Sequence, residues 1–131
     1  MGSSGHYELP CEYAAKNIFP SIRASIATIL VRDKKMSKYM AAKVLGTTPA
    51  AVTYYMVGKR GDKYSSAILS DGELKRLASE AAEVLIELSK DSSKEKFMKY
   101  QILLCSICSR LNRLAQERGC PATLFGGINA R

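Results

Sequence analysis

The chain has few of the residues that most enzymes use at an active site. Its 131 residues contain no tryptophan and a single histidine, His6, in the N-terminal stretch MGSSGH. That stretch resembles an artificial extension, and without it histidine catalysis and histidine metal ligation are disfavoured. No paired carboxylates and no phosphate-binding glycine loop are visible. The sequence therefore predicts a protein that is not an enzyme.

Long hydrophobic runs are also missing. The longest candidate, residues 22–31, carries Arg23 and is shorter than the roughly 20 residues that a membrane helix needs. Residues 1–6 lack the basic and apolar regions of a signal peptide. Because 47% of the residues are hydrophobic and 24% are charged, the composition is that of a globular chain. We expect a cytoplasmic protein with no membrane partner.

No stretch alternates apolar and polar residues as a half-buried strand does. Apolar residues instead recur three and four positions apart, which is typical of helices. The pattern predicts an all-α fold with long helices over 12–32, 70–90 and 94–118. We expect Pro20 to break the first of these near residues 17–19, because proline removes a backbone hydrogen bond. Residues 62–69 read as a connector.

Two short helices with a tight turn between them are predicted over residues 37–57. Ser37 can cap the first helix, and Gly46 can end it, as glycine often does just past a helix. Thr48 can cap the second helix, with Pro49 at its first position, where the missing N–H costs nothing. This arrangement is typical of a helix-turn-helix, whose second helix enters the major groove of DNA.

Positive charge is concentrated on the same stretch. The chain has a net charge of +8. Residues 32–63 alone contain eight basic residues against two acidic ones, a net of +6, while residues 1–31 are neutral. A local cationic patch neutralises phosphates and releases their counterions. Charge and motif together predict double-stranded DNA as a partner, although a solvated lysine-rich surface is the plainer alternative.

Several short motifs between Leu9 and Gly61 resemble a known family. They resemble archaeal predicted transcriptional regulators of the lambda-repressor-like helix-turn-helix superfamily, also called XRE-type. The motifs are Leu9-Pro10-Cys11-Glu12, Phe19-Pro20-Ser21-Ile22-Arg23, Ala42-Lys43-Val44-Leu45-Gly46, Ala50-Ala51-Val52-Thr53-Tyr54-Tyr55 and Gly58-Lys59-Arg60-Gly61. The chain departs from the family at Thr48-Pro49-Ala50-Ala51, where many relatives have glutamine or serine.

The resemblance implies which residues face the DNA. It places Thr48, Ala50, Thr53 and Tyr54 toward the major groove. In chemical terms, threonine hydroxyls can bond phosphates or base edges, and an alanine methyl can contact a thymine methyl. Either Tyr54 or Tyr55 is expected in the core, because one of them shares a helix face with Val52.

Cations on both sides of this helix are the expected phosphate contacts. Lys59 and Arg60 lie between two flexible glycines after the second helix, and we expect them to grip phosphate. Lys38 and Lys43, on the first helix of the motif, are secondary candidates. An ordinary exposed turn at residues 58–61 is the alternative.

The two long helices predicted after residue 64 form a hairpin. We divide the chain into a helix-turn-helix domain, residues 7–63, and a C-terminal dimerisation and cysteine region, residues 64–131. The stripe Leu74, Leu77, Ala81, Val84, Leu85 and Leu88 is assigned to contacts between two copies, giving a homodimer that reads two half-sites. Packing of this stripe within its own chain is the alternative.

Four cysteines form a candidate metal site. Cys105 and Cys108 have C-x-x-C spacing on a predicted helix, and Cys11 and Cys120 lie near helix ends. Four thiolates suit an iron–sulfur cluster, for example 4Fe–4S, or a structural zinc. A disulfide or inert buried thiols would also fit these cysteines. With a cluster at this site, the protein is expected to be a DNA-binding transcriptional regulator that senses redox state or oxygen. Its rival is a regulator whose cysteines hold zinc or a disulfide and sense nothing.

Overall fold

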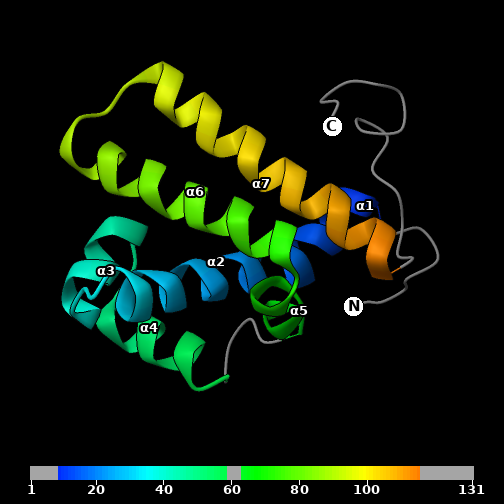
Figure 1. The fold of residues 1–131 in the computed structure, drawn as a ribbon, viewed down its shortest axis with the longest axis horizontal. Helices are drawn as coiled ribbons and strands as arrows, with labels where there is room; N and C mark the ends of the chain where they lie inside the picture. The colour runs from blue at the N-terminus through cyan, green and yellow to red at the C-terminus, as the bar shows by residue number, and fades with distance from the viewer. Residues whose placement is uncertain (1–8, 59–62, 116–131) are drawn as a thin grey trace.

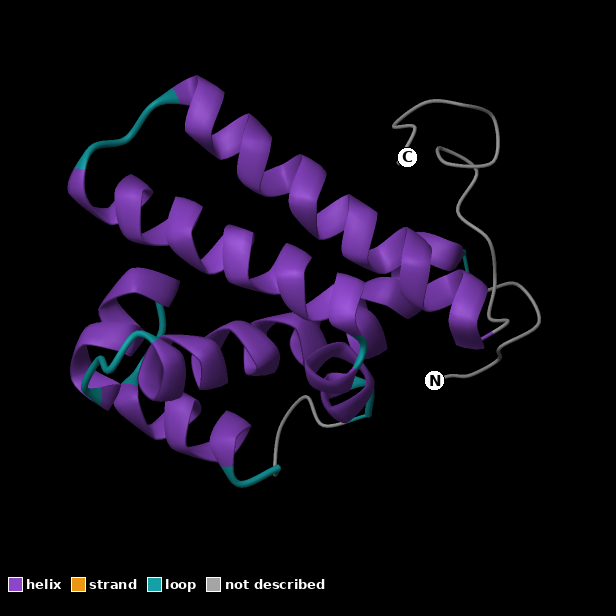
Figure 2. Cartoon of the chain, in the orientation of Figure 1, coloured by secondary structure: helices purple, strands orange, loops and turns teal. Residues whose placement is uncertain are grey.

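The computed structural model describes residues 9–58 and 63–115, and within these ranges it is helical, with no strand (Figure 2). The all-α prediction is confirmed for this part of the chain. The elements, including two π-helical turns labelled η, are in chain order α1 (Pro10–Tyr13), η2 (Ala14–Ile18), α2 (Phe19–Thr28), η3 (Ile29–Asp33), α3 (Lys38–Leu45), α4 (Pro49–Met56), α5 (Ser65–Ser70), α6 (Gly72–Lys90) and α7 (Lys94–Ala115).

Helix α2 is the central element of the fold. It contacts α3, α4, α5, α6 and α7. Helices α6 and α7 form a hairpin on one side of α2, and α4 lies on the opposite side (Figure 1). The two helices of the predicted motif and the C-terminal hairpin are therefore joined through one shared helix.

The expected break at Pro20 is wrong. The chain stays helical from Pro10 to Asp33, and it widens into the π turn η2 immediately before the proline. In that turn the backbone N–H of Phe19 donates to the carbonyl of Ala14. The hydroxyl of Ser21 donates to the carbonyl of Asn17 at 3.1 Å. Pro20 is tolerated because it lies in the first turn of α2, where the wider π turn has already shifted the hydrogen-bond pattern.

Residues 65–70, predicted as connector, form helix α5. Its Ile68 is fully buried against the core. Before α5, the backbone N–H of Tyr64 donates to the hydroxyl oxygen of Ser21 at 3.0 Å. The hydroxyl groups of Tyr13 and Tyr64 are also hydrogen-bonded to each other. These long-range contacts, which sequence periodicity does not register, hold the start of α5 on α1 and α2.

Helix α6 begins at Gly72, two residues after the predicted start at residue 70. Asp71, not Ser70, caps α6: its carboxylate accepts from the backbone N–H of Leu74 at 2.9 Å. Ser93 caps α7 by accepting from the N–H of Lys96 at 3.1 Å. The predicted end of α7 near residue 118 lies outside the described residues.

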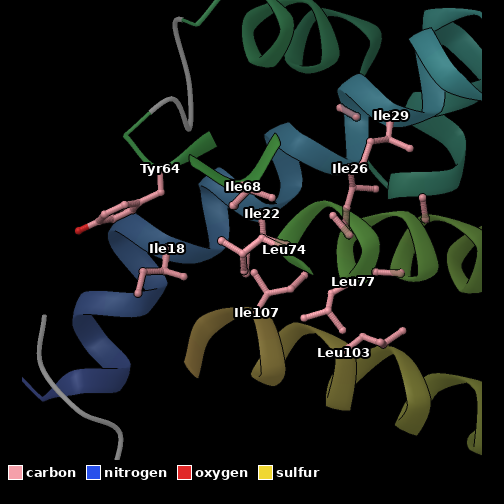
Figure 3. Packing of buried hydrophobic residues seen from close by; sticks show 14 of the residues in the cluster. Ile18, Ile22, Ile26, Ile29, Tyr64, Ile68, Leu74, Leu77, Leu103 and Ile107 are labelled. Atoms are coloured by element: carbon pink, nitrogen blue, oxygen red, sulfur yellow. The ribbon is translucent and has the colours of Figure 1, made fainter. Parts of the chain in front are cut away.

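One hydrophobic core contains residues from both predicted regions. Figure 3 shows Ile22 and Ile26 of α2 together with Leu74 of α6 and Ile107 of α7. All four are fully buried and belong to a single cluster. The division at residue 63/64 stays a prediction, but the buried side chains on its two sides share one core.

The stripe on α6 that we assigned to a dimer is used inside the chain. Leu74 and Ala81 are fully buried, and Leu77 and Val84 are nearly so. Helix α6 packs on α7 and also on α2 and α3, which together cover this face. The assignment of the stripe to contacts between copies is therefore wrong for these four residues, which are already buried within the chain, whereas Leu85 and Leu88 are only half-buried.

Candidate nucleic-acid interface

Helices α3 and α4 are joined by a tight turn whose capping residues are those predicted. The hydroxyl of Ser37 accepts from the N–H of Met40 at 3.1 Å and caps α3. The hydroxyl of Thr48 accepts from the N–H of Ala51, also at 3.1 Å, and caps α4. Pro49 is the first residue of α4. Each cap satisfies a backbone donor that a helix start otherwise leaves unpaired.

Gly46 makes the turn between the two helices possible. Its φ of 73° lies in the left-handed region, where a side chain is strained. The N–H of Gly46 donates to the carbonyl of Lys43 at 3.3 Å, and that of Thr47 donates to the carbonyl of Ala42 at 2.9 Å. This pair of bonds is the Schellman motif, which closes the C-terminus of α3 and turns the chain into α4.

Small side chains let α4 approach its neighbours closely. Ala41 and Ala42 of α3 are buried, as are Ala51 and Val52 of α4. Helix α4 packs on both α2 and α3. One face of α4 is thus fully used by the fold, and the opposite face points away from the protein.

The residues predicted to face DNA lie on or beside that outward face. Ala50 is exposed, Tyr54 is 42% exposed and Thr53 is half-buried. Thr48 is exposed, although its hydroxyl oxygen already accepts the capping bond. Tyr55, by contrast, packs against the core. The sequence predicted one of the two tyrosines in the core, and the structure shows that it is Tyr55.

The candidate phosphate contacts are only partly within the described residues. Lys38 and Lys43 are exposed on α3, and among the described residues neither forms an ion pair. Lys59 and Arg60 lie outside the described residues. Two of the four predicted phosphate cations are therefore available on the surface of α3, the helix on which α4 packs.

Two residues of the positive stretch form ion pairs with helix α6. The ammonium group of Lys34 forms an ion pair with Glu83 of α6 at 2.9 Å. The hydrogen bond from Lys34, followed by its charge, holds the pKa of the Glu83 carboxyl below its ordinary value. Lys75 of α6 lies 3.8 Å from Asp33. Glu83 adds one negative charge to the stretch and Lys75 adds one positive charge, so the net excess is unchanged, but Lys34 is no longer a free cation.

Exposed apolar side chains near the motif were missed in the sequence. Val57, directly after α4, is 62% exposed, and Tyr39 on α3 is 65% exposed. Val57 was taken only as the end of the helix. Its position seven residues after Ala50, two helical turns along, was the signal that it shares the outward face.

Two of the four cysteines can be placed with their side chains. Cys105 and Cys108 lie three residues apart on α7, the first half-buried and the second buried. Cys11 belongs to α1, but its side chain, like the whole of Cys120, is outside the described residues. Helix α1 and the end of α7 lie at the same end of the long axis (Figure 1). Where side chains are described, no three metal-ligating groups gather.

Comparison with models of known protein families, with curated proteins and with solved structures finds no match. Across the two described ranges, no helix is both long enough and apolar enough to cross a membrane.

Proposed function

We propose that the protein is a cytoplasmic DNA-binding transcriptional regulator that uses α3, the turn and α4 as a helix-turn-helix. One observation carries the proposal: α4 is anchored by Ala51 and Val52 while its opposite face is exposed, and α3, on which α4 packs, carries the exposed cations Lys38 and Lys43, which form no ion pair among the described residues. A surface helix of this kind, presented by a rigid core and flanked by positive charge, suits the major groove. The resemblance to XRE-type archaeal regulators is part of the proposal.

The residues divide into two roles. Lys38 and Lys43, with Lys59 and Arg60, bind phosphates and set the position of the protein on the duplex. Ala50, Thr53 and Tyr54 meet base edges. Thr48 keeps α4 capped and can still donate its hydroxyl proton to a phosphate.

Pairing of two copies on two half-sites is a further part of the proposal, because a helix-turn-helix commonly reads a site with two-fold symmetry. Most of the α6 stripe is buried, so the pairing uses another surface. Sedimentation of the complex with a duplex of roughly 24 base pairs, about two helical turns, measures the stoichiometry. One chain per duplex at saturation contradicts the dimer but leaves DNA binding intact.

We also propose that Cys105 and Cys108 supply two ligands of a cysteine-bound cluster, with Cys11 and Cys120 as the other two. Residues three apart on a helix lie about 5–6 Å apart at Cβ, close enough to share one cluster. A cluster bound there would give the regulator a redox or oxygen signal; zinc or a disulfide is the alternative. Anaerobic purification, visible absorption and iron and zinc analysis test this, and a colourless metal-free protein contradicts it.

The DNA-binding proposal is tested by titrating a labelled mixed-sequence duplex at several salt concentrations. Affinity should fall steeply with salt, with the logarithmic slope reduced by about one for each phosphate contact removed. Lys38→Gln and Lys43→Gln should each weaken binding and flatten the slope. Lys94→Gln, which removes an exposed cation from the start of α7, is the matched control and should change neither.

Single-stranded DNA of the same sequence is the competitor. Binding to single strands that equals binding to the duplex would overturn the proposal. So would a salt slope that Lys38→Gln, Lys43→Gln and Lys94→Gln reduce equally, because that result would show attraction by net charge alone.

A further inference from the structure

The outward face of α4 carries no charge and no amide. It consists of Pro49, Ala50, Thr53, Tyr54 and Val57, at spacings that place them on one side of the helix. Val57, at 62% exposure, and Ala50 are the apolar groups that stand clear of the protein. The most exposed part of the proposed recognition helix is thus a row of methyl and methylene groups.

This composition limits what the helix can read. Guanine is usually read by arginine or lysine, adenine by asparagine or glutamine, and cytosine by a carboxylate. None of these side chains is on the outward face of α4. The base-edge group that apolar side chains do contact in the major groove is the C5 methyl of thymine.

The spacing of the two apolar residues sets a length. Seven residues of helix rise by about 10 Å, which corresponds to about three base pairs of DNA. Ala50 and Val57 therefore lie at the two ends of the surface that would contact these three base pairs, with Thr53 and Tyr54 between them.

An exposed apolar helix face can also dock on another protein. Charge decides against that occupant here. On α6 and α7 some of the described cations are paired with carboxylates, as in Arg76 with Glu73 and Arg110 with Asp71, whereas others such as Lys94 are not. Lys38 and Lys43 lie exposed on α3, the helix on which α4 packs, and form no ion pair among the described residues, so this part of the surface offers positive charge to an anionic partner. A duplex supplies methyl groups and phosphates together.

Resting on the proposed function, we infer that α4 selects thymine by its C5 methyl group, through Ala50 and Val57, within a stretch of about three base pairs. The chain thereby recognises A·T-containing sites by apolar contact in the major groove. Hydrogen-bonded readout of guanine is not part of this specificity.

Four synthetic polymers test the inference with the full chain: alternating dA-dT, the same duplex with deoxyuridine in place of thymidine, alternating dG-dC, and the dG-dC duplex with 5-methylcytosine in place of cytosine. Deoxyuridine removes only the methyl group. Burial of one methyl group corresponds to roughly a fourfold change in affinity. We expect the thymine duplex to bind about fourfold to fifteenfold more tightly than the uracil duplex. Methylation of cytosine should strengthen binding to the dG-dC duplex.

Val57→Thr replaces one methyl group by a hydroxyl at an exposed position, and it should reduce the thymine-to-uracil ratio severalfold. Ile102→Thr makes a similar change on α7, where Ile102 is 49% exposed, and should leave the ratio unchanged.

The outcomes separate the two proposals. Equal affinity for thymine and uracil duplexes, with binding still salt-dependent, overturns the thymine inference and leaves DNA binding standing. Equal loss of discrimination in Val57→Thr and Ile102→Thr overturns it as well. No binding to any duplex, or tighter binding to an acidic polypeptide such as polyglutamate, overturns the proposed function itself.

Discussion

Gly46 and Gly72 differ in backbone conformation but not in the space around them. Gly46 has a φ of +73°, and a Cβ added there would meet nothing within 4 Å. Gly72 also has open space, but its backbone is not in the left-handed region. Any difference between alanine substitutions at the two positions therefore reports backbone conformation, not crowding.

Gly46→Ala should lower the free energy of unfolding by about 1–2 kcal/mol, the cost of a left-handed backbone for an L-residue. Gly72→Ala, in the first turn of α6, should be neutral or raise it by up to about 1 kcal/mol. Urea unfolding followed by far-UV circular dichroism measures both. Equal effects would mean that the turn between α3 and α4 is not left-handed in solution.

At the scale of elements, Asp71 joins the start of α6 to α7. Its carboxylate caps α6 and also accepts from the guanidinium of Arg110, with Nε 3.0 Å from Oδ2. The hydrogen bond from Arg110, followed by the one from the N–H of Leu74, holds the pKa of Asp71 below its ordinary value of 3.8. The charged form of Asp71 is therefore the one that the fold stabilises.

A carboxyl with a lowered pKa in the folded state stabilises the protein above its unfolded pKa, and this contribution is lost as pH falls through the folded pKa. The pKa values of Glu73 and Glu83 are also lowered, by hydrogen bonds from Arg76 and Lys34 respectively, so these carboxyls contribute to stability with the same pH dependence. The free energy of unfolding should thus decline as pH falls from about 5 to below the ordinary carboxyl pKa values.

Asp71→Asn isolates one part of this decline. Asparagine still caps a helix but lacks the charge, so the variant should be less stable at neutral pH and lose less stability in acid. Ser70→Ala, which leaves the pair with Arg110 intact, should keep the parental acid slope. Urea unfolding across a pH series compares them, and a parental slope in Asp71→Asn would contradict the assigned role.

At the scale of the whole molecule, the shared core predicts that the two regions unfold together. Ile107 of α7 is fully buried, whereas Ile102 on the same helix is 49% exposed. Ile107→Ala should lower the free energy of unfolding by about 2–5 kcal/mol. Ile102→Ala, the matched control, should change it by no more than about 0.5 kcal/mol.

The loss in Ile107→Ala should be reported equally by tyrosine fluorescence, to which Tyr39 and Tyr54 contribute, and by circular dichroism. Two separate transitions, with only one shifted by Ile107→Ala, would instead support independent domains divided at residue 63/64. The experiment thus also tests the predicted boundary.

Local features of the fold were predictable because local chemistry specifies them. A hydroxyl three residues before a backbone N–H makes a cap, and glycine permits a left-handed turn. Ser37, Gly46 and Thr48 were therefore assigned correctly. Pro20 was misjudged because a π turn absorbed the missing bond, and residues 65–70 were misjudged because their helix depends on burial of Ile68 in a distant core.

What the sequence by itself determined was the helical class, the two short helices with their turn, and the excess of positive charge on that stretch. These follow from periodicity, capping and composition, which act over a few residues. Tertiary structure decided the rest. It buried most of the α6 stripe inside the chain, neutralised Lys34 with Glu83, and chose Tyr54 over Tyr55 for the surface. It also left Val57 on the outward face of α4. Each of these depends on which elements meet in space, and burial and ion pairing across long sequence separations have no signature in a local pattern.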